Sequence, residues 1–129
     1  MRARSPRNDE DLLTALTPER RWCPALEGVT EAVVVCGHTH MQFDRQLGLW
    51  RVVNAGAVGW PYEGRARAYS LLLGPDVEHR RTEYDIDSAA AAMRAGGNPD
   101  TDELLRESLF KPSDPREVAE LFERHADGR

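Results

Sequence analysis

The segment Val33-Val34-Val35-Cys36-Gly37-His38-Thr39-His40 joins an apolar run to a His-x-His motif through one glycine. β-Branched residues favour strands, and four consecutive apolar residues predict a strand that is buried on both faces. Gly37 permits a sharp turn, or a close approach to a ligand, at the end of that strand. If the extended geometry continues, His38 and His40 point to the same side. Two neutral imidazoles offered together suit a divalent transition metal such as Mn, Zn, Fe or Ni.

A bare His-x-His motif is equally consistent with two partly exposed loop histidines. The metal-site interpretation is favoured by the glycine-rich segment that follows, Val52–Pro61. Between the two motifs, residues 41–53 alternate around a short turn, which predicts a β-hairpin. Its return strand brings the glycine-rich segment back beside the histidines. We expect Asn54 to support this loop through side-chain to backbone bonds, and Gly56 and Gly59 to allow close backbone approach to a ligand.

The two motifs together resemble the end of a calcineurin-like metallophosphoesterase. That family typically has G-H-T-H followed by N-P-G-S-V-G, and this chain has Gly37–Met41, a hairpin and then Asn54–Pro61. The order and spacing of the pair are specific, and the resemblance runs from Ser5 to the C-terminus. It implies an α/β fold that is the C-terminal part of a four-layer α/β/β/α sandwich, with mostly antiparallel hairpins followed by helices.

The resemblance also implies a dinuclear site at the strand ends, which holds two divalent ions such as Mn, Zn, Fe or Ni. His38 and His40 match the family's last motif, in which the first histidine reaches one metal and the second reaches the other. The implied reaction is hydrolysis of a phosphate mono- or diester, in which the metals polarise the phosphoryl oxygens and activate a water. The residues implied to support the loop or the substrate are Gly37, Asn54, Gly56 and Gly59.

Three further family motifs, Asp-x-His, Gly-Asp-x-x-Asp and Gly-Asn-His, do not occur in these 129 residues. Near the N-terminus, Ser5–Arg7 align with a family segment whose preceding ligand histidine falls on Ala3. Asp9–Asp11 are interpreted as a solvated acidic loop. No catalytic residue is therefore assigned. We expect the chain by itself to bind Mn or Zn weakly and to lack phosphoesterase activity, because two histidines form an incomplete ligand set.

Three interpretations follow from this resemblance and its gaps. The chain is the C-terminal half of a phosphoesterase, through truncation, a split gene or a late start site. Alternatively, it is a non-catalytic remnant or partner-binding module of the same fold. In the third interpretation the resemblance is accidental, and the chain is a small β-rich protein that binds metal through His-x-His. In the first case we expect a missing N-terminal half, or self-association, to cover the apolar residues of Val33–Val35 and Tyr69–Leu73. Family motifs encoded upstream of Met1 would distinguish the first interpretation.

The rest of the sequence predicts one partial domain, with a loop and helix at 1–31, strands at 32–85 and helices at 86–129. A second hairpin is expected within 65–84, with His79 on an exposed strand face. Cap residues and acidic first turns predict where the helices begin. The expected starts are Thr17, Asp87 or Ser88, Asp100 or Thr101, and Ser113.

The chain carries 17 basic and 22 acidic residues, for a net charge of −5. This balance argues against a dedicated nucleic-acid surface or an anionic-membrane surface. No segment reaches membrane-spanning length and no apolar segment follows the N-terminal arginines, so a cytoplasmic location is expected. Cys23 and Cys36 have no zinc or redox spacing, and Cys36 is expected to be a small core residue.

Overall fold

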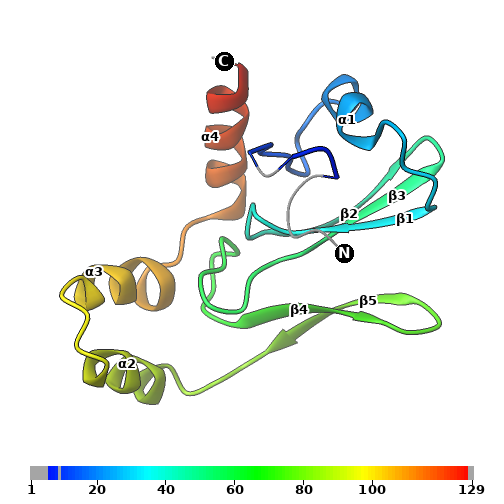
Figure 1. The fold of residues 1–129 in the computed structure, drawn as a ribbon. Helices are drawn as coiled ribbons and strands as arrows, with labels where there is room; N and C mark the ends of the chain where they lie inside the picture. The colour runs from blue at the N-terminus through cyan, green and yellow to red at the C-terminus, as the bar shows by residue number, and fades with distance from the viewer. Residues whose placement is uncertain (1–5, 9, 128–129) are drawn as a thin grey trace.

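The computed structural model describes residues 6–8 and 10–127. The described residues form a three-stranded sheet and a two-stranded sheet. Figure 1 shows α1 (Glu19–Leu26) on one side of the first sheet and the second sheet on its other side, while α2 (Ile86–Ala95) and α3 (Thr101–Leu105) extend away from both. The final helix, α4, returns to lie beside the N-terminal segment. In chain order the elements are α1 (Glu19–Leu26), β1 (Val33–Cys36), β2 (Gln42–Leu47), β3 (Trp50–Ala55), β4 (Ala68–Leu73), β5 (Val77–Thr82), α2 (Ile86–Ala95), α3 (Thr101–Leu105), the π-helical η1 (Arg106–Phe110) and α4 (Pro115–Asp127).

The three-stranded sheet has the order β1-β3-β2. β2 and β3 form the first predicted hairpin. Its turn contains Gly48 at a φ of 58°, a left-handed conformation that glycine adopts without steric cost. β1 pairs with β3 in parallel, and their register ends at Cys36 opposite Asn54. Because parallel strands end at the same edge, the loop after Cys36 and the loop after β3 leave the sheet side by side.

The second predicted hairpin, β4 and β5, forms the two-stranded sheet. Two side chains link it to the first sheet: Gln42 Nε2 donates to the Ser70 carbonyl at 3.0 Å, and His79 Nε2 bonds the Asn54 carbonyl at 2.9 Å. His79 is half-buried through this contact. The prediction that His79 lies on an exposed strand face is therefore wrong, because strand alternation does not reveal which face a second sheet will cover.

The main core lies between α1 and the three-stranded sheet. Trp22 is 1% exposed and meets Phe43 edge-on, with ring centroids 6.0 Å apart at 75°. Fully burying a side chain of this kind contributes about 1.5–3 kcal/mol relative to leaving it in water. The buried members of this core are Leu13, Trp22, Ala25, Leu26, Val34, Cys36, Phe43, Leu47 and Val52.

Within the described residues, β1 is an edge strand, with β3 as its one neighbour. Val34 is buried in the core beneath α1, whereas Val33 is 42% exposed. The prediction of burial on both faces is therefore wrong for Val33, although the apolar run does form the expected strand. On the second sheet, Leu72 and Leu73 are 48% and 55% exposed. Both sheets thus leave apolar side chains open to solvent.

We expect the two cysteines to differ in reactivity. Burial raises the pKa of the Cys36 thiol to about 12, against a smaller opposing effect of the hydrogen bond with Asn54. Cys23 is exposed. Because the thiolate is the reactive form, a thiol reagent such as Ellman's reagent at pH 8 should modify one cysteine in the native protein and both in urea. A Cys23→Ser control should abolish the native reaction. Rapid modification of Cys36 in the folded chain would contradict this assignment.

The C-terminal helices form a second, smaller core outside the sheets. α2 begins at Ile86 and is capped by Asp85, whose carboxylate accepts from the Ser88 backbone N at 3.0 Å. Asp87 or Ser88 was the predicted cap, so the prediction is late by two or three residues. None of the helices in residues 6–8 and 10–127 combines the length and apolar character needed to cross a bilayer. The buried members of the second core are Ala90, Leu105 and Leu109, with Ala66, Tyr84, Ile86 and Ala89 packed against them.

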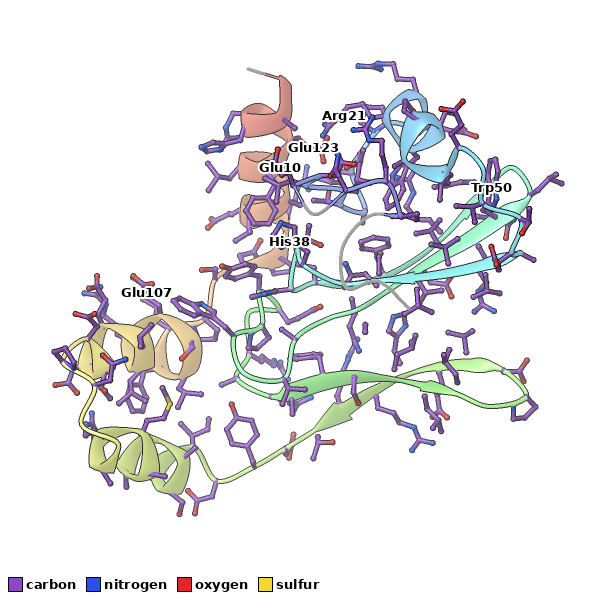
Figure 2. The ribbon with its side chains drawn as sticks, in the orientation of Figure 1. Glu10, Arg21, His38, Trp50, Glu107 and Glu123 are labelled. Carbon is purple, nitrogen blue, oxygen red and sulfur yellow. The ribbon has the colours of Figure 1, made fainter. Side chains whose placement is uncertain are left out.

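α4 docks through Glu123 onto α1 and the residues that precede it. Its carboxylate accepts from Thr14 Oγ1 at 2.8 Å, from Arg21 Nη1 at 2.7 Å and from the Thr17 hydroxyl. Figure 2 shows Arg21 and Glu123 facing one another across this contact. Thr17 therefore does not cap α1, whose N-cap is Pro18. Its hydroxyl is used for a tertiary contact that the local sequence does not reveal.

Candidate metal-binding site

The two histidines lie in a loop, not in a strand. β1 ends at Cys36, and the following residues have irregular backbone in which the Thr39 N–H donates to the Gly37 carbonyl at 2.9 Å. His38 and His40 have positive φ angles of 75° and 57°. Residues other than glycine rarely adopt this conformation, and such strain clusters at functional sites. The extended geometry of β1 therefore does not continue to His38 and His40. Strand alternation, from which we expected the two side chains to point to one side, does not set their direction.

His40 is held by Trp60, near the end of the glycine-rich segment, and by Tyr62, just after it. Its Nδ1 lies 2.8 Å from the Trp60 carbonyl oxygen. A carbonyl only accepts, so Nδ1 carries the proton of the neutral ring and Nε2 keeps a free lone pair. The imidazole also stacks on Tyr62, with ring centroids 5.3 Å apart at 25°. These contacts select the tautomer and the plane of the ring.

His38 is half-buried. Figure 2 shows it at the carboxyl end of β1, on the side toward α4. Between the two histidines, Thr39 is 1% exposed, and its hydroxyl lies 3.5 Å from the Leu13 carbonyl. The loop is thus anchored at its centre by Thr39, while its two histidines stay partly accessible at the sheet edge.

Asn54 connects the histidine loop to the glycine loop. It is fully buried, and its Nδ2 donates to the Gly37 carbonyl and to Thr39 Oγ1, each at 3.0 Å. Its Oδ1 accepts from the Gly56 N–H at 2.9 Å. One side chain therefore joins both loops where β1 and β3 end. A role for Asn54 toward a substrate stays a prediction.

The glycine loop owes its path to Gly56. Gly56 has a φ of 78°, and a β-carbon there would lie 2.8 Å from Gln42 Cγ and 2.9 Å from Tyr69 Cβ. The close approach at Gly56 is therefore to the protein's own side chains. At Gly59, in contrast, a β-carbon would meet nothing within 4 Å. The predicted roles of Gly37, Gly56 and Gly59 toward a ligand stay predictions.

Tyr62 and Glu63, which follow the glycine-rich segment, contact the histidine loop and β2, and no role was predicted for them from the sequence. The Tyr62 N–H donates to the His40 carbonyl at 3.1 Å, and the Glu63 carboxylate accepts from the Gln42 backbone N. Burial raises the pKa of Tyr62, with a smaller effect from the negative charge of Glu107, so its phenol stays neutral. The aromatic pair flanking Pro61 was the available sequence signal. A contact made by a backbone carbonyl, as at Trp60, has no signal of that kind.

The described residues fit part of a metal site. Nε2 of His40 is a suitable donor for Mn, Zn, Fe or Ni, and His38 supplies a second imidazole two residues away. Across residues 6–8 and 10–127, no group of three or more His, Cys, Asp or Glu side chains is arranged to hold a metal ion. Ala3, which aligns with a ligand histidine of the family, and Asp9 of the acidic loop lie outside the described residues. These ranges thus supply an incomplete ligand set.

Two of the solved structures that match this chain show its likeness in fold. The crystal structure of a hypothetical protein from Pyrococcus horikoshii OT3 superposes with a TM-score of 0.65 at 18% identity, covering 80% of this chain and 43% of that one. The crystal structure of a metallophosphoesterase from Sphaerobacter thermophilus gives a TM-score of 0.59 at 24% identity, covering 80% of this chain and 52% of that one. This chain has a metallophosphoesterase-like fold.

The metallophosphoesterase-like fold confirms the expected α/β class and is consistent with the C-terminal part of that sandwich. This chain spans about half the length of the two structures that it matches. No protein-family model and no curated protein matches the sequence. At these identities the likeness establishes the fold, while metal binding and activity require their own evidence.

Proposed function

We propose that this chain carries the final metal-binding segment of a phosphoesterase that hydrolyses phosphate mono- or diesters at a dinuclear metal site. The observation that carries the proposal is the bond from His40 Nδ1 to the Trp60 carbonyl, at 2.8 Å. Metal-binding histidines almost always donate their second ring nitrogen to a carbonyl, a carboxylate or water. The positive φ of both histidines is typical of a functional site, and the metallophosphoesterase-like fold supports this reaction class.

In this proposal His38 and His40 each bind one divalent ion, Mn, Zn, Fe or Ni. The bound ions supply Lewis-acid activation of the phosphoryl group and of a water. The chain's own residues hold the two imidazoles at the carboxyl end of β1 and fix the tautomer of His40. Asn54 and Gly56 keep the glycine loop against the histidine loop, so that the site is preorganised before metal binds.

The remaining ligands come from further polypeptide of the same fold, linked to this chain or separate from it. The metallophosphoesterase from Sphaerobacter thermophilus is matched over 52% of its length, which leaves room for such a segment. Val33, Leu72 and Leu73 are the exposed apolar side chains of the two sheets that such a segment would cover. Self-association is the competing way to cover these residues.

A second candidate function is a non-catalytic module of the same fold that binds a partner protein. The incomplete ligand set within residues 6–8 and 10–127 favours this candidate. The two functions differ in what the chain does once the rest of the fold is supplied.

The test compares this chain alone with the chain extended by whatever is encoded directly upstream of Met1. We expect the chain alone to bind Mn²⁺ weakly in calorimetric titration and not to hydrolyse bis-p-nitrophenyl phosphate. The extended protein should hydrolyse it in a Mn²⁺-dependent way, with a loss of about 100-fold or more on changing His38 or His40 to Ala.

The matched control is His125→Ala, since His125 lies exposed on α4 with its Nδ1 bonded to the Leu121 carbonyl. That variant should keep full activity. Hydrolysis that survives loss of both His38 and His40 would overturn the proposed roles. An extended protein that folds but neither binds metal nor hydrolyses the ester would favour the non-catalytic module.

A further inference from the structure

We infer that Tyr62 is a positioning residue for His40, and that α4 holds Tyr62 in place through Phe122, so that docking of the C-terminal helix sets the metal affinity of the site. The metal part of this inference rests on the proposed function. The positioning part rests on the geometry of the described residues alone.

Three rings in consecutive contact connect the histidine loop to α4. The Tyr62 ring lies over the His40 imidazole, at 5.3 Å between centroids and 25° between planes. The Phe122 ring meets Tyr62 edge-on, at 6.1 Å and 73°. Both are favoured arrangements of aromatic pairs. The Tyr62 backbone is also bonded to the His40 carbonyl at 3.1 Å, so backbone and ring are tied to the same residue.

Phe122 is in turn fixed by its neighbour in sequence. Glu123 accepts hydrogen bonds from Thr14, Thr17 and Arg21, which anchor α4 to the N-terminal segment. The Glu123 side chain is half-buried. Its hydrogen bonds are made by an ionised carboxylate, and such bonds are stronger than those between neutral groups. A chain of contacts therefore runs from the anchor at Glu123, through Phe122 and Tyr62, to the imidazole of His40.

The contacts from Glu123 to His40 determine how the imidazole of His40 is oriented toward a metal. The bond from Nδ1 to the Trp60 carbonyl fixes one atom of the imidazole, but it leaves the plane of the ring free to tilt about that bond. The stacked Tyr62 ring removes the tilt, and this determines where Nε2 points. Without the stack, metal binding must itself order the ring. Ordering one side chain of this kind corresponds to about a three- to tenfold loss in affinity.

The experiment uses the 129-residue chain and two nuclear magnetic resonance readouts. Without metal, the His40 ring protons should show an upfield ring-current shift that disappears in Tyr62→Ala, is reduced in Phe122→Ala and Glu123→Gln, and is kept in Tyr62→Phe. With Mn²⁺ alone as the probe, broadening of the same signals should require about three to ten times more metal in Tyr62→Ala than in wild type or Tyr62→Phe.

Matched controls separate positioning from general loss of packing. Phe110→Ala removes a phenylalanine that is 52% exposed on η1, and Tyr84→Ala removes a tyrosine from the second core. Both should leave the His40 signals unchanged. If Tyr62→Ala does not fold, Tyr62→Leu keeps a large apolar side chain but removes the ring current and the flat stacking surface.

The outcomes for the two ideas are distinguishable. Unchanged His40 shifts in folded Tyr62→Ala or Tyr62→Leu, or equal Mn²⁺ broadening in Tyr62→Ala and wild type, would overturn the inference. Absence of Mn²⁺ broadening at His40 in every protein, with the ring-current pattern as expected, would count against the proposed metal site while supporting Tyr62 as the residue that orients the ring.

Discussion

Replacing Asn54 by alanine is expected to lower the free energy of unfolding by about 3–5 kcal/mol. The substitution removes two donated bonds, to Gly37 and Thr39, and one accepted from the Gly56 N–H. Asn54 is fully buried, so water cannot replace it at these groups without a rearrangement of the loop. A buried polar group left without a partner costs about 1–3 kcal/mol, and the costs of neighbouring groups are not additive.

Urea unfolding followed by circular dichroism measures this effect. Asn98→Ala is the matched control, because Asn98 is exposed and its Oδ1 accepts from the Asp100 N–H in a surface turn. That variant should lose less than about 1 kcal/mol. A folded Asn54→Ala protein within 1 kcal/mol of wild type would show that the two loops are held together by other contacts.

Replacing Trp22 by alanine should destabilise the chain by a similar amount, about 3–5 kcal/mol. Trp22 is 1% exposed and occupies the centre of the contact between α1 and the three-stranded sheet. The alanine variant loses the edge-on contact with Phe43 and leaves a cavity that the sheet cannot close. Because α1 then loses its main attachment, we expect a lower midpoint in both thermal and urea unfolding.

Trp22→Phe provides a sharper comparison than a surface control. Trp22 Nε1 is buried and has no hydrogen-bond partner within the described residues. Phenylalanine keeps an aromatic ring against Phe43 and removes this unsatisfied donor, so it should cost less than half as much as alanine. Leu49→Ala, at a side chain that is 87% exposed, should be neutral. Equal losses in Trp22→Phe and Trp22→Ala would mean that the indole group itself is required.

Several features of this molecule follow from local chemistry and were predictable. Alternating residues with a turn between them predicted both hairpins, and both form. The β-branched run predicted β1, and Asp100 is the N-cap of α3, as the residue types indicated. The last helix is capped by Asp114, one residue after the expected Ser113. The resemblance carried by the two loop motifs predicted the fold class that the solved structures support. Each of these signals depends on neighbours in sequence, where side-chain type and backbone conformation are directly coupled.

Other features depend on which elements pack together, and the sequence pattern does not encode them locally. Strand alternation could not show that His79 faces the first sheet, or that Val33 stays open while Val34 is buried. Thr17 has the chemistry of an N-cap, but Glu123 of α4 takes its hydroxyl. At Thr17 a tertiary contact thus prevails over an N-cap preference worth about 1 kcal/mol.

The candidate site divides in the same way. Its residues, His38 and His40 beside the Asn54 loop, were identified from motif and spacing, because residue type alone limits which side chains bind metal. Their orientation depends on the tertiary structure. Both histidines have a left-handed backbone, and Nδ1 of His40 bonds the Trp60 carbonyl. The Tyr62 ring stacks on His40 and contacts Phe122 of α4. A backbone carbonyl and a stacked ring act through position, and position is set only when β1, β3 and α4 come together.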